Sequence, residues 1–245
     1  MKATRLTVLG LLALAVLAGC RADPAVAAYV DGARITEAEV DQVIDELRAE
    51  VGGSIEDELA ELAGELDEAA LAERETQQFD QLEQQLGAVR EQVVELRVLT
   101  EAGTRYAEQE GIAVPAADLA QVGTDFGLSP DSSYVAVVAE FVAVRDALRD
   151  SVEPEPPTEA DQREVYEHLV ADGLTVPFEQ VRPELNEQLL GDPVAFRNLL
   201  TEAVERADIQ LNPRYQLVHR VPVQIGSTQT WLGVPLGESA VVDSA

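Results

Sequence analysis

The chain of 245 residues is strongly acidic: 46 Asp and Glu residues stand against 17 Lys and Arg residues, for a formal net charge of −29. Such a surface repels nucleic acid and anionic lipid headgroups, so the composition argues against a DNA- or RNA-binding protein. Only 4% of the residues are aromatic, so we expect a core of Leu, Val and Ala, which suits closely packed helices.

The first twenty residues have the pattern of an export signal. Lys2 and Arg5 precede an apolar run at 6–17, which is shorter than the ~20 residues needed to span a hydrocarbon core. The residues Leu-Ala-Gly-Cys at 17–20 then resemble the lipobox of bacterial lipoproteins. The resemblance implies cleavage after residue 19 and lipid attachment to Cys20, the only cysteine of the chain. The alternative is an ordinary secretory signal with a chance cysteine.

Removal of a signal peptide at 1–19 would make Cys20 the first residue of the mature protein. The only lysine, Lys2, and Arg5 would be lost with it, leaving 15 arginines against 46 acids, a net charge of −31. We therefore expect an extracytoplasmic protein held at the bacterial cell membrane by its lipid anchor, since two or three acyl chains anchor stably. Codon bias of a GC-rich genome and adaptation to salt both explain the acidity, and both stay open.

The mature chain opens with a strand, a turn and a helix. Residues 27–31 predict a short buried strand, and Asp31-Gly32 is a turn dipeptide. Thr36 and Glu39 form a capping box that starts a helix. Gly52-Gly53 predicts the end of that helix, with a second one beginning near residue 54. The acidic, Ala-rich residues 56–75 are either a solvated helix or a mobile insertion.

The strongest periodic signal predicts a long helix from about 68 to 110. Apolar residues recur in steps of three and four, which makes a continuous stripe along one face. We expect the stripe to form an intramolecular hairpin or bundle seam rather than a dimeric coiled coil. Gly103 marks a candidate break or kink, and Gly111 a C-cap. The stripe consists of Phe79, Leu82, Leu86, Val89, Val93 and Leu96.

The second half predicts further helices that begin at Pro115, at Ser129-Pro130, at Thr158, at Phe178 and at Asp192-Pro193. For the segment after Pro130, a strand is an alternative because valine is frequent there. Alternation at 207–211 predicts a strand. Residues 216–245 form a separate C-terminal tail, read either as a β-hairpin or as a loosely ordered segment.

Four segments, in order, resemble the SurA/PrsA-type extracytoplasmic chaperones. They are 28–40 (strand, Asp-Gly turn and Ile-Thr helix start), 91–119, 157–166, and 178–181 together with 207–215. The resemblance covers about residues 25–215 and implies a SurA N-terminal-like domain at 20–215. It implies a mainly helical lobe in which a strand near 27–31 pairs with one near 207–212. Each strand is too short to stand alone, which agrees with this pairing.

One departure from that family bears on the chemistry. Two-part members carry a peptidyl-prolyl isomerase domain of the parvulin type, but residues 154–177 are only 24 positions, below the roughly 50 that a domain needs. We therefore expect no isomerase activity and name no catalytic residue. His168 and His219 lie far apart, so we expect surface or packing histidines, with no metal and no cofactor.

The functional expectation is a membrane-anchored holdase that binds unfolded or extended polypeptide clients through an apolar groove. The alternative is a structural or adaptor lipoprotein whose long, heptad-patterned helix binds a dedicated protein partner or a second copy. An enzyme is not expected, because the many carboxylates are predicted to lie on the solvated faces of helices. A solute-binding lipoprotein fits poorly, since repeated βα units are absent from the pattern.

Overall fold

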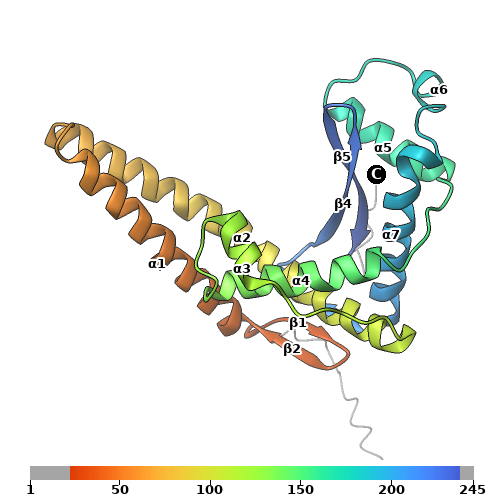
Figure 1. Ribbon diagram of the computed structural model, residues 1–245, viewed down its shortest axis with the longest axis horizontal. Helices are drawn as coiled ribbons and strands as arrows, with labels where there is room; N and C mark the ends of the chain where they lie inside the picture. The colour runs from red at the N-terminus through yellow and green to blue at the C-terminus, as the bar shows by residue number, and fades with distance from the viewer. Residues whose placement is uncertain (1–22, 238–245) are drawn as a thin grey trace, which may run out of the picture.

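The computed structural model describes residues 23–237, so the proposed signal peptide at 1–19 and Cys20 lie outside the described residues. Within that range the protein is mainly helical, as expected, with seven helices and five strands. A long helical arm extends from a base that carries a small sheet, and a second lobe with a β-hairpin stands on the same base (Figure 1).

The arm is an antiparallel pair of helices, α1 (Glu37–Leu62) and α2 (Glu68–Glu110). The capping box of Thr36 and Glu39 is present at the start of α1. The predicted stop at Gly52-Gly53 is wrong, because α1 continues through both glycines. Each glycine costs about 1 kcal/mol of helix propensity, but Gly52 faces Phe79 of α2, and packing of the two helices offsets that cost. Residues 56–75 are therefore the tip of the arm rather than an insertion.

The apolar stripe of α2 packs inside the molecule. Leu82, Leu86, Val93 and Leu96 are buried, while Phe79 and Val89 are half-buried against the same core. The expected intramolecular seam is thus present.

Helix α2 also passes through Gly103 without a break, contrary to the expected kink. A Cβ atom there would lie 2.7 Å from Cγ1 of Val144, so the missing side chain lets α2 and α4 (Ser133–Arg149) cross closely. Gly111 caps α2 in the left-handed region with φ 71°, as predicted.

The base of the arm is a three-stranded antiparallel sheet. Its strands are β1 (Val26–Val30), β2 (Ala33–Thr36) and β3 (Ile209–Leu211), in the order β2-β1-β3. Tyr29 pairs with Gln210, so the expected pairing of an N-terminal with a C-terminal strand is confirmed. Asp31 and Gly32 both have positive φ and form the tight turn between β1 and β2.

The remaining helices differ from the expectation mainly at their starts. The helix α3 (Leu119–Phe126) begins at Leu119 instead of Pro115, with Asp118 as its cap. The valine-rich segment is the helix α4 and not a strand. The helix α5 (Glu159–Ala171) starts with the predicted capping at Thr158.

The two helices predicted from Phe178 and from Asp192-Pro193 are wrong in extent. The first shrinks to the single turn α6 (Phe178–Val181), and α7 (Glu187–Arg206) starts earlier, with the Asn186 side chain as its cap. Helix α7 runs through Pro193, which removes one backbone hydrogen bond. Burial of a full face of α7, including Leu190 and Val194, outweighs that loss.

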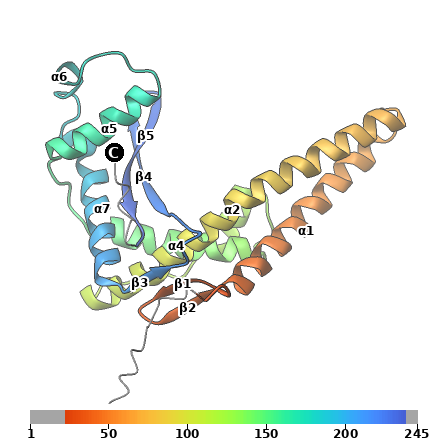
Figure 2. The same ribbon diagram turned by 180° about the vertical axis from the view of Figure 1, so that it is seen from behind.

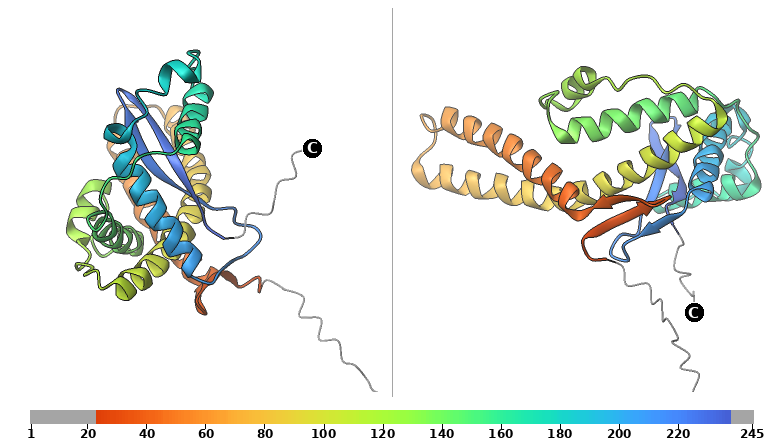
Figure 3. Two further views of the ribbon diagram at one scale, coloured as in Figure 1. Left: turned by 90° about the vertical axis from the view of Figure 1, so that its right-hand side faces the viewer. Right: turned by 90° about the horizontal axis from the view of Figure 1, so that it is seen from below.

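The C-terminal segment forms the hairpin alternative. Strands β4 (Val218–Ile225) and β5 (Thr228–Pro235) pair over their whole length. The face that carries Val221, Val223, Leu232 and Val234 is buried. Helix α7 lies along the hairpin, and α5 follows the outer side of β5 (Figures 2 and 3). The hairpin is therefore part of the second lobe and shares its core.

Candidate functional site

Both histidines hold the hairpin in place, as packing residues. The His168 ring on α5 stacks on the Trp231 ring with a centroid separation of 3.7 Å, and its Nδ1 lies 3.0 Å from the Trp231 carbonyl oxygen. On the other strand, Nδ1 of His219 lies 2.7 Å from Oε1 of Glu95 on α2. Since carbonyl and carboxylate oxygens only accept hydrogen bonds, Nδ1 carries the proton in both contacts.

A buried ion pair connects α5, α7 and the hairpin. Asp161, with 4% of its side chain exposed, pairs with Arg197, which also lies 3.6 Å from Glu164. Glu164 in turn accepts a 2.7 Å hydrogen bond from the Gly233 backbone N–H on β5. Burial alone would raise the pKa of Asp161, but hydrogen bonds from Thr158 and the charge of Arg197 hold that pKa below its usual range.

The two outer edges of the hairpin differ. Trp231 and Gly233 point their backbone groups away from β4, and α5 closes that edge through His168 and Glu164. Because Arg220 pairs with Gly233 and Pro222 with Trp231, the backbone groups of Arg220 and Pro222 point away from β5.

Strand periodicity places Gln224 on the same outer edge of β4. Among residues 23–237, no hydrogen bond reaches the outward backbone groups of Arg220, Pro222 and Gln224. All three residues are exposed. The β4 edge is therefore an open strand edge.

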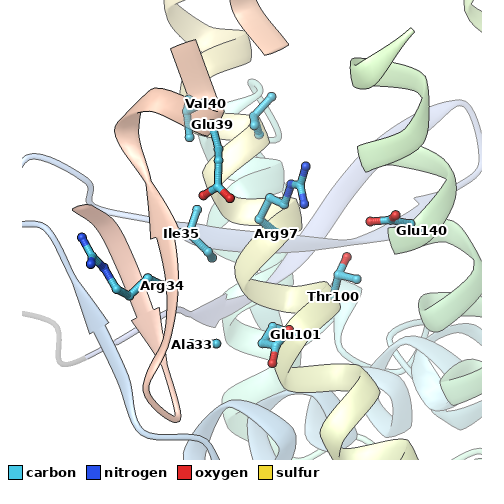
Figure 4. A pocket seen from close by; sticks show the side chains of 10 residues that line it. Ala33, Arg34, Ile35, Glu39, Val40, Arg97, Thr100, Glu101 and Glu140 are labelled. Carbon is cyan, nitrogen blue, oxygen red and sulfur yellow. The ribbon is translucent and has the colours of Figure 1, made fainter. Parts of the chain in front are cut away.

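A second candidate is a small polar pocket between β2, α1, α2 and α4, with a volume of about 160 Å³. Arg97 points into it between Glu39 and Glu140, and Thr100 also lines it (Figure 4). Glu39 is committed to the cap of α1, and hydrogen bonds from Thr36 lower its pKa. The pocket is too small for a client segment, and its charged lining of both signs does not suit an apolar one.

Charge is distributed unevenly over the two regions. The distal arm, residues 45–83, contains fourteen Asp and Glu residues and two arginines, Arg48 and Arg74. Both arginines are paired on the surface, at 2.7 Å to Glu83 and 2.9 Å to Glu58. The distal arm therefore presents a strongly negative surface at the end of the molecule that points away from the hairpin (Figures 1 and 3).

Sequence reasoning missed the β4 edge as a candidate site, because residues 216–245 were interpreted as a β-hairpin or a loosely ordered tail and no binding role was assigned to either. The signal was present in the alternation of 218–225 and in Pro222, since proline in a strand indicates an edge. The one predicted site residue, Cys20, lies outside the described residues, so its lipid attachment stays a prediction.

Within residues 23–237, no cluster of His, Cys, Asp and Glu has the arrangement of a metal site. None of the helices in this range has the length and apolar composition that a membrane span requires. Comparison with protein-family models, with curated proteins and with solved structures finds no match.

Proposed function

We propose that the protein is a lipid-anchored extracytoplasmic holdase, which binds unfolded or extended segments of exported polypeptides and has no isomerase activity. The observation that carries the proposal is the open edge of β4, where Arg220, Pro222 and Gln224 present unpaired backbone groups. An unfolded chain offers the complementary backbone groups regardless of its sequence, and open strand edges are known to pair with such chains.

Three further features support the proposal. The order of the elements agrees with the resemblance to SurA/PrsA-type chaperones, including the short pairing of β1 with β3. A lipid on Cys20 would raise the effective concentration of the protein where exported chains emerge. The net charge of −29 favours solubility of a client complex.

Suppression of client aggregation tests this proposal. The mature chain, carrying Cys20→Ser to keep it in solution, is added to a chemically unfolded client, and light scattering is followed. We expect scattering to fall at near-equimolar ratios. A folded protein of similar size and net charge is the control, because charge alone can keep a mixture soluble. Undiminished scattering at several-fold excess would contradict the holdase proposal.

The adaptor alternative now takes a different form. Leu86 and Val93 are buried between the helices of the molecule, so the apolar stripe is already occupied. An adaptor would have to bind through the acidic outer surface of the arm. Sedimentation at two concentrations and two salt concentrations tests for self-association, which a holdase does not require. Leu86→Asp and Val93→Asp are unsuitable for this test, because a buried unpaired carboxylate unfolds the chain.

A further inference from the structure

We propose that the pocket between β2, α1, α2 and α4 binds a small zwitterion, a free α-amino acid with a short aliphatic side chain. The ligand carboxylate pairs with Arg97, the ammonium group pairs with Glu140, and the side chain contacts the apolar lining. The inference goes beyond the holdase proposal and is independent of it, because it uses none of the residues of the β4 edge. Three properties of the pocket lead to this assignment: its unpartnered charges, its apolar lining and its volume.

Arg97 is an arginine without an ionic partner in a strongly acidic chain. Most arginines in residues 23–237 pair with a neighbouring carboxylate, as Arg48 and Arg105 do. Among these residues Arg97 forms neither an ion pair nor a hydrogen bond, although it is half-buried. Figure 4 shows its guanidinium pointing into the pocket. A ligand carboxylate would give this group two parallel, charge-assisted hydrogen bonds.

Glu140 is the complementary group, on the α4 side of the pocket. The other two carboxylates that line the pocket are committed, because Glu39 caps α1 and Glu101 lies 2.8 Å from Arg105. In the described part of the chain, Glu140 has neither an ion pair nor a hydrogen bond. Its carboxylate points toward the Arg97 side of the pocket (Figure 4). A ligand ammonium group therefore finds its acceptor there.

One unpartnered cation beside one unpartnered anion selects a zwitterion. A simple anion would satisfy Arg97, but Glu140 and the net charge of −29 would repel it. A simple cation would leave Arg97 without a partner. An α-amino acid carries both charges on neighbouring groups and is neutral overall, so it satisfies both side chains without this repulsion.

Volume and lining restrict the ligand further. The pocket has a volume of about 160 Å³. Since a cavity of roughly 150 Å³ holds a molecule as large as benzene, the ligand has about six to eight non-hydrogen atoms. Ile35, Val40 and Val93 line the pocket, and the two valines belong to the core. A short aliphatic side chain fits this lining, and L-valine falls in the size range.

A series of three probes tests the choice of a zwitterion. Ligand-observed NMR, which suits weak binding, measures the affinity of L-valine for the mature Cys20→Ser chain at low salt. The matched probes are 3-methylbutanoate, which lacks the ammonium group of valine, and 2-methylpropylamine, which lacks the carboxylate. We expect L-valine to bind with a dissociation constant of about 1 mM. Each of the other two probes should bind roughly tenfold more weakly or worse, because it loses one charge-assisted contact.

The matched protein variants are Arg97→Gln and Arg149→Gln. Both remove one positive charge and no ion pair seen within residues 23–237. Arg149 is exposed in the last turn of α4 and does not line the pocket, so it controls for the change in net charge. Circular dichroism and the melting temperature check folding of both. We expect Arg97→Gln to bind L-valine roughly tenfold more weakly than Arg149→Gln, which should bind like the unchanged protein.

Each outcome supports or overturns the inference. Absence of L-valine binding at a concentration of about 10 mM, or equal affinity of Arg97→Gln and Arg149→Gln, would overturn it. Equal affinity for L-valine and 3-methylbutanoate would overturn the role of Glu140 and the choice of a zwitterion. If Arg97→Gln does not fold, the three probes on the unchanged protein decide the question alone. None of these results bears on suppression of client aggregation, which tests the holdase proposal separately.

Discussion

The arm and the hairpin lobe are stabilised in different ways. In the arm, α1 and α2 are joined by a five-residue turn and pack through repeated apolar contacts. Its distal ion pairs lie on the surface, and one partly buried pair, Arg90 with Glu37, lies at its base. In the lobe, strands β4 and β5 contact His168, Glu164 and Glu95, which lie far away in the sequence. Asp161 of α5 pairs with Arg197 of α7 beside them. The arm therefore depends on many similar contacts, and the lobe on a few specific ones.

This difference predicts where single substitutions act strongly. Loss of one apolar contact in a long helical pair leaves the other contacts in place. Loss of one buried charged partner leaves the other without compensation, and that is costly in a region of low dielectric. The following substitutions test the contrast, in order of decreasing effect.

Asp161→Ala should have the largest effect. It leaves Arg197, with 17% of its side chain exposed, without its closest partner. It also removes the half of the α5 capping box in which the Asp161 carboxylate accepts a hydrogen bond from the Thr158 backbone N–H. We expect a loss of about 3–5 kcal/mol in the free energy of unfolding, measured by urea denaturation. Fluorescence of Trp231 follows the lobe directly. A loss below about 1 kcal/mol would show that the lobe does not depend on this pair.

Gly103→Ala should destabilise the base of the arm. Its Cβ would lie 2.7 Å from Val144 Cγ1 and 3.2 Å from Leu148 Cδ1, so α2 and α4 must move apart, at a cost of about 1–3 kcal/mol. The matched control is Gly87→Ala in the same helix, where no neighbouring atom lies within 4 Å. That change should stabilise by about 0.5–1 kcal/mol. If both substitutions change the free energy of unfolding in the same direction, the close crossing of α2 and α4 is contradicted.

Acid should weaken the lobe through Asp161. Its pKa in the folded protein lies below the ordinary value of 3.8, so its ionised form favours folding. This contribution is complete above the pKa of the unfolded chain and is lost as the pH falls through the folded pKa. Urea denaturation from about pH 6 to pH 2.5 measures it. The difference in stability between wild type and Asp161→Asn should shrink below about pH 4; a constant difference would argue against this linkage.

Arg74→Ala should have the smallest effect. Its pair with Glu58 at 2.9 Å lies on the arm surface, with 49% and 48% of the two side chains exposed. Exposed pairs contribute about 0–1 kcal/mol. We expect a change within about 0.5 kcal/mol, at the limit of detection by urea denaturation. A loss as large as that of Asp161→Ala would remove the distinction between the two regions.

The sequence predicts the arm better than the lobe. The Thr36–Glu39 capping box, the stripe from Phe79 to Leu96 and the Gly111 cap depend on neighbours within a few turns, and all three are present. The helix breaks predicted at Gly52-Gly53 and Gly103 do not occur, because helix packing outweighs a local preference of about 1 kcal/mol against glycine. The start expected at Asp192-Pro193 failed for the same reason.

The candidate site depends on information that a linear pattern lacks. The alternation of 218–225 indicates a strand, but whether its edge is open depends on which helix lies beside it. Helix α5 closes β5 and leaves β4 unpaired, although α5 lies more than forty residues earlier in the chain. By contrast, the prediction of lipid attachment at Cys20 rests on the sequence alone, because Cys20 lies outside the described residues.

The helical class, the acidity and the long stripe could be predicted from the sequence, because periodicity, composition and local capping act over a few residues. The pairing of the strands near 27–31 and 207–212 was instead implied by the family resemblance, since these strands lie far apart in the chain. Three features could be seen only in the folded molecule: α1 and α2 continue through their glycines, α7 includes Pro193, and residues 218–235 pack as a hairpin with one open edge. These features depend on burial and on backbone partners from distant segments, and such energies exceed local preferences.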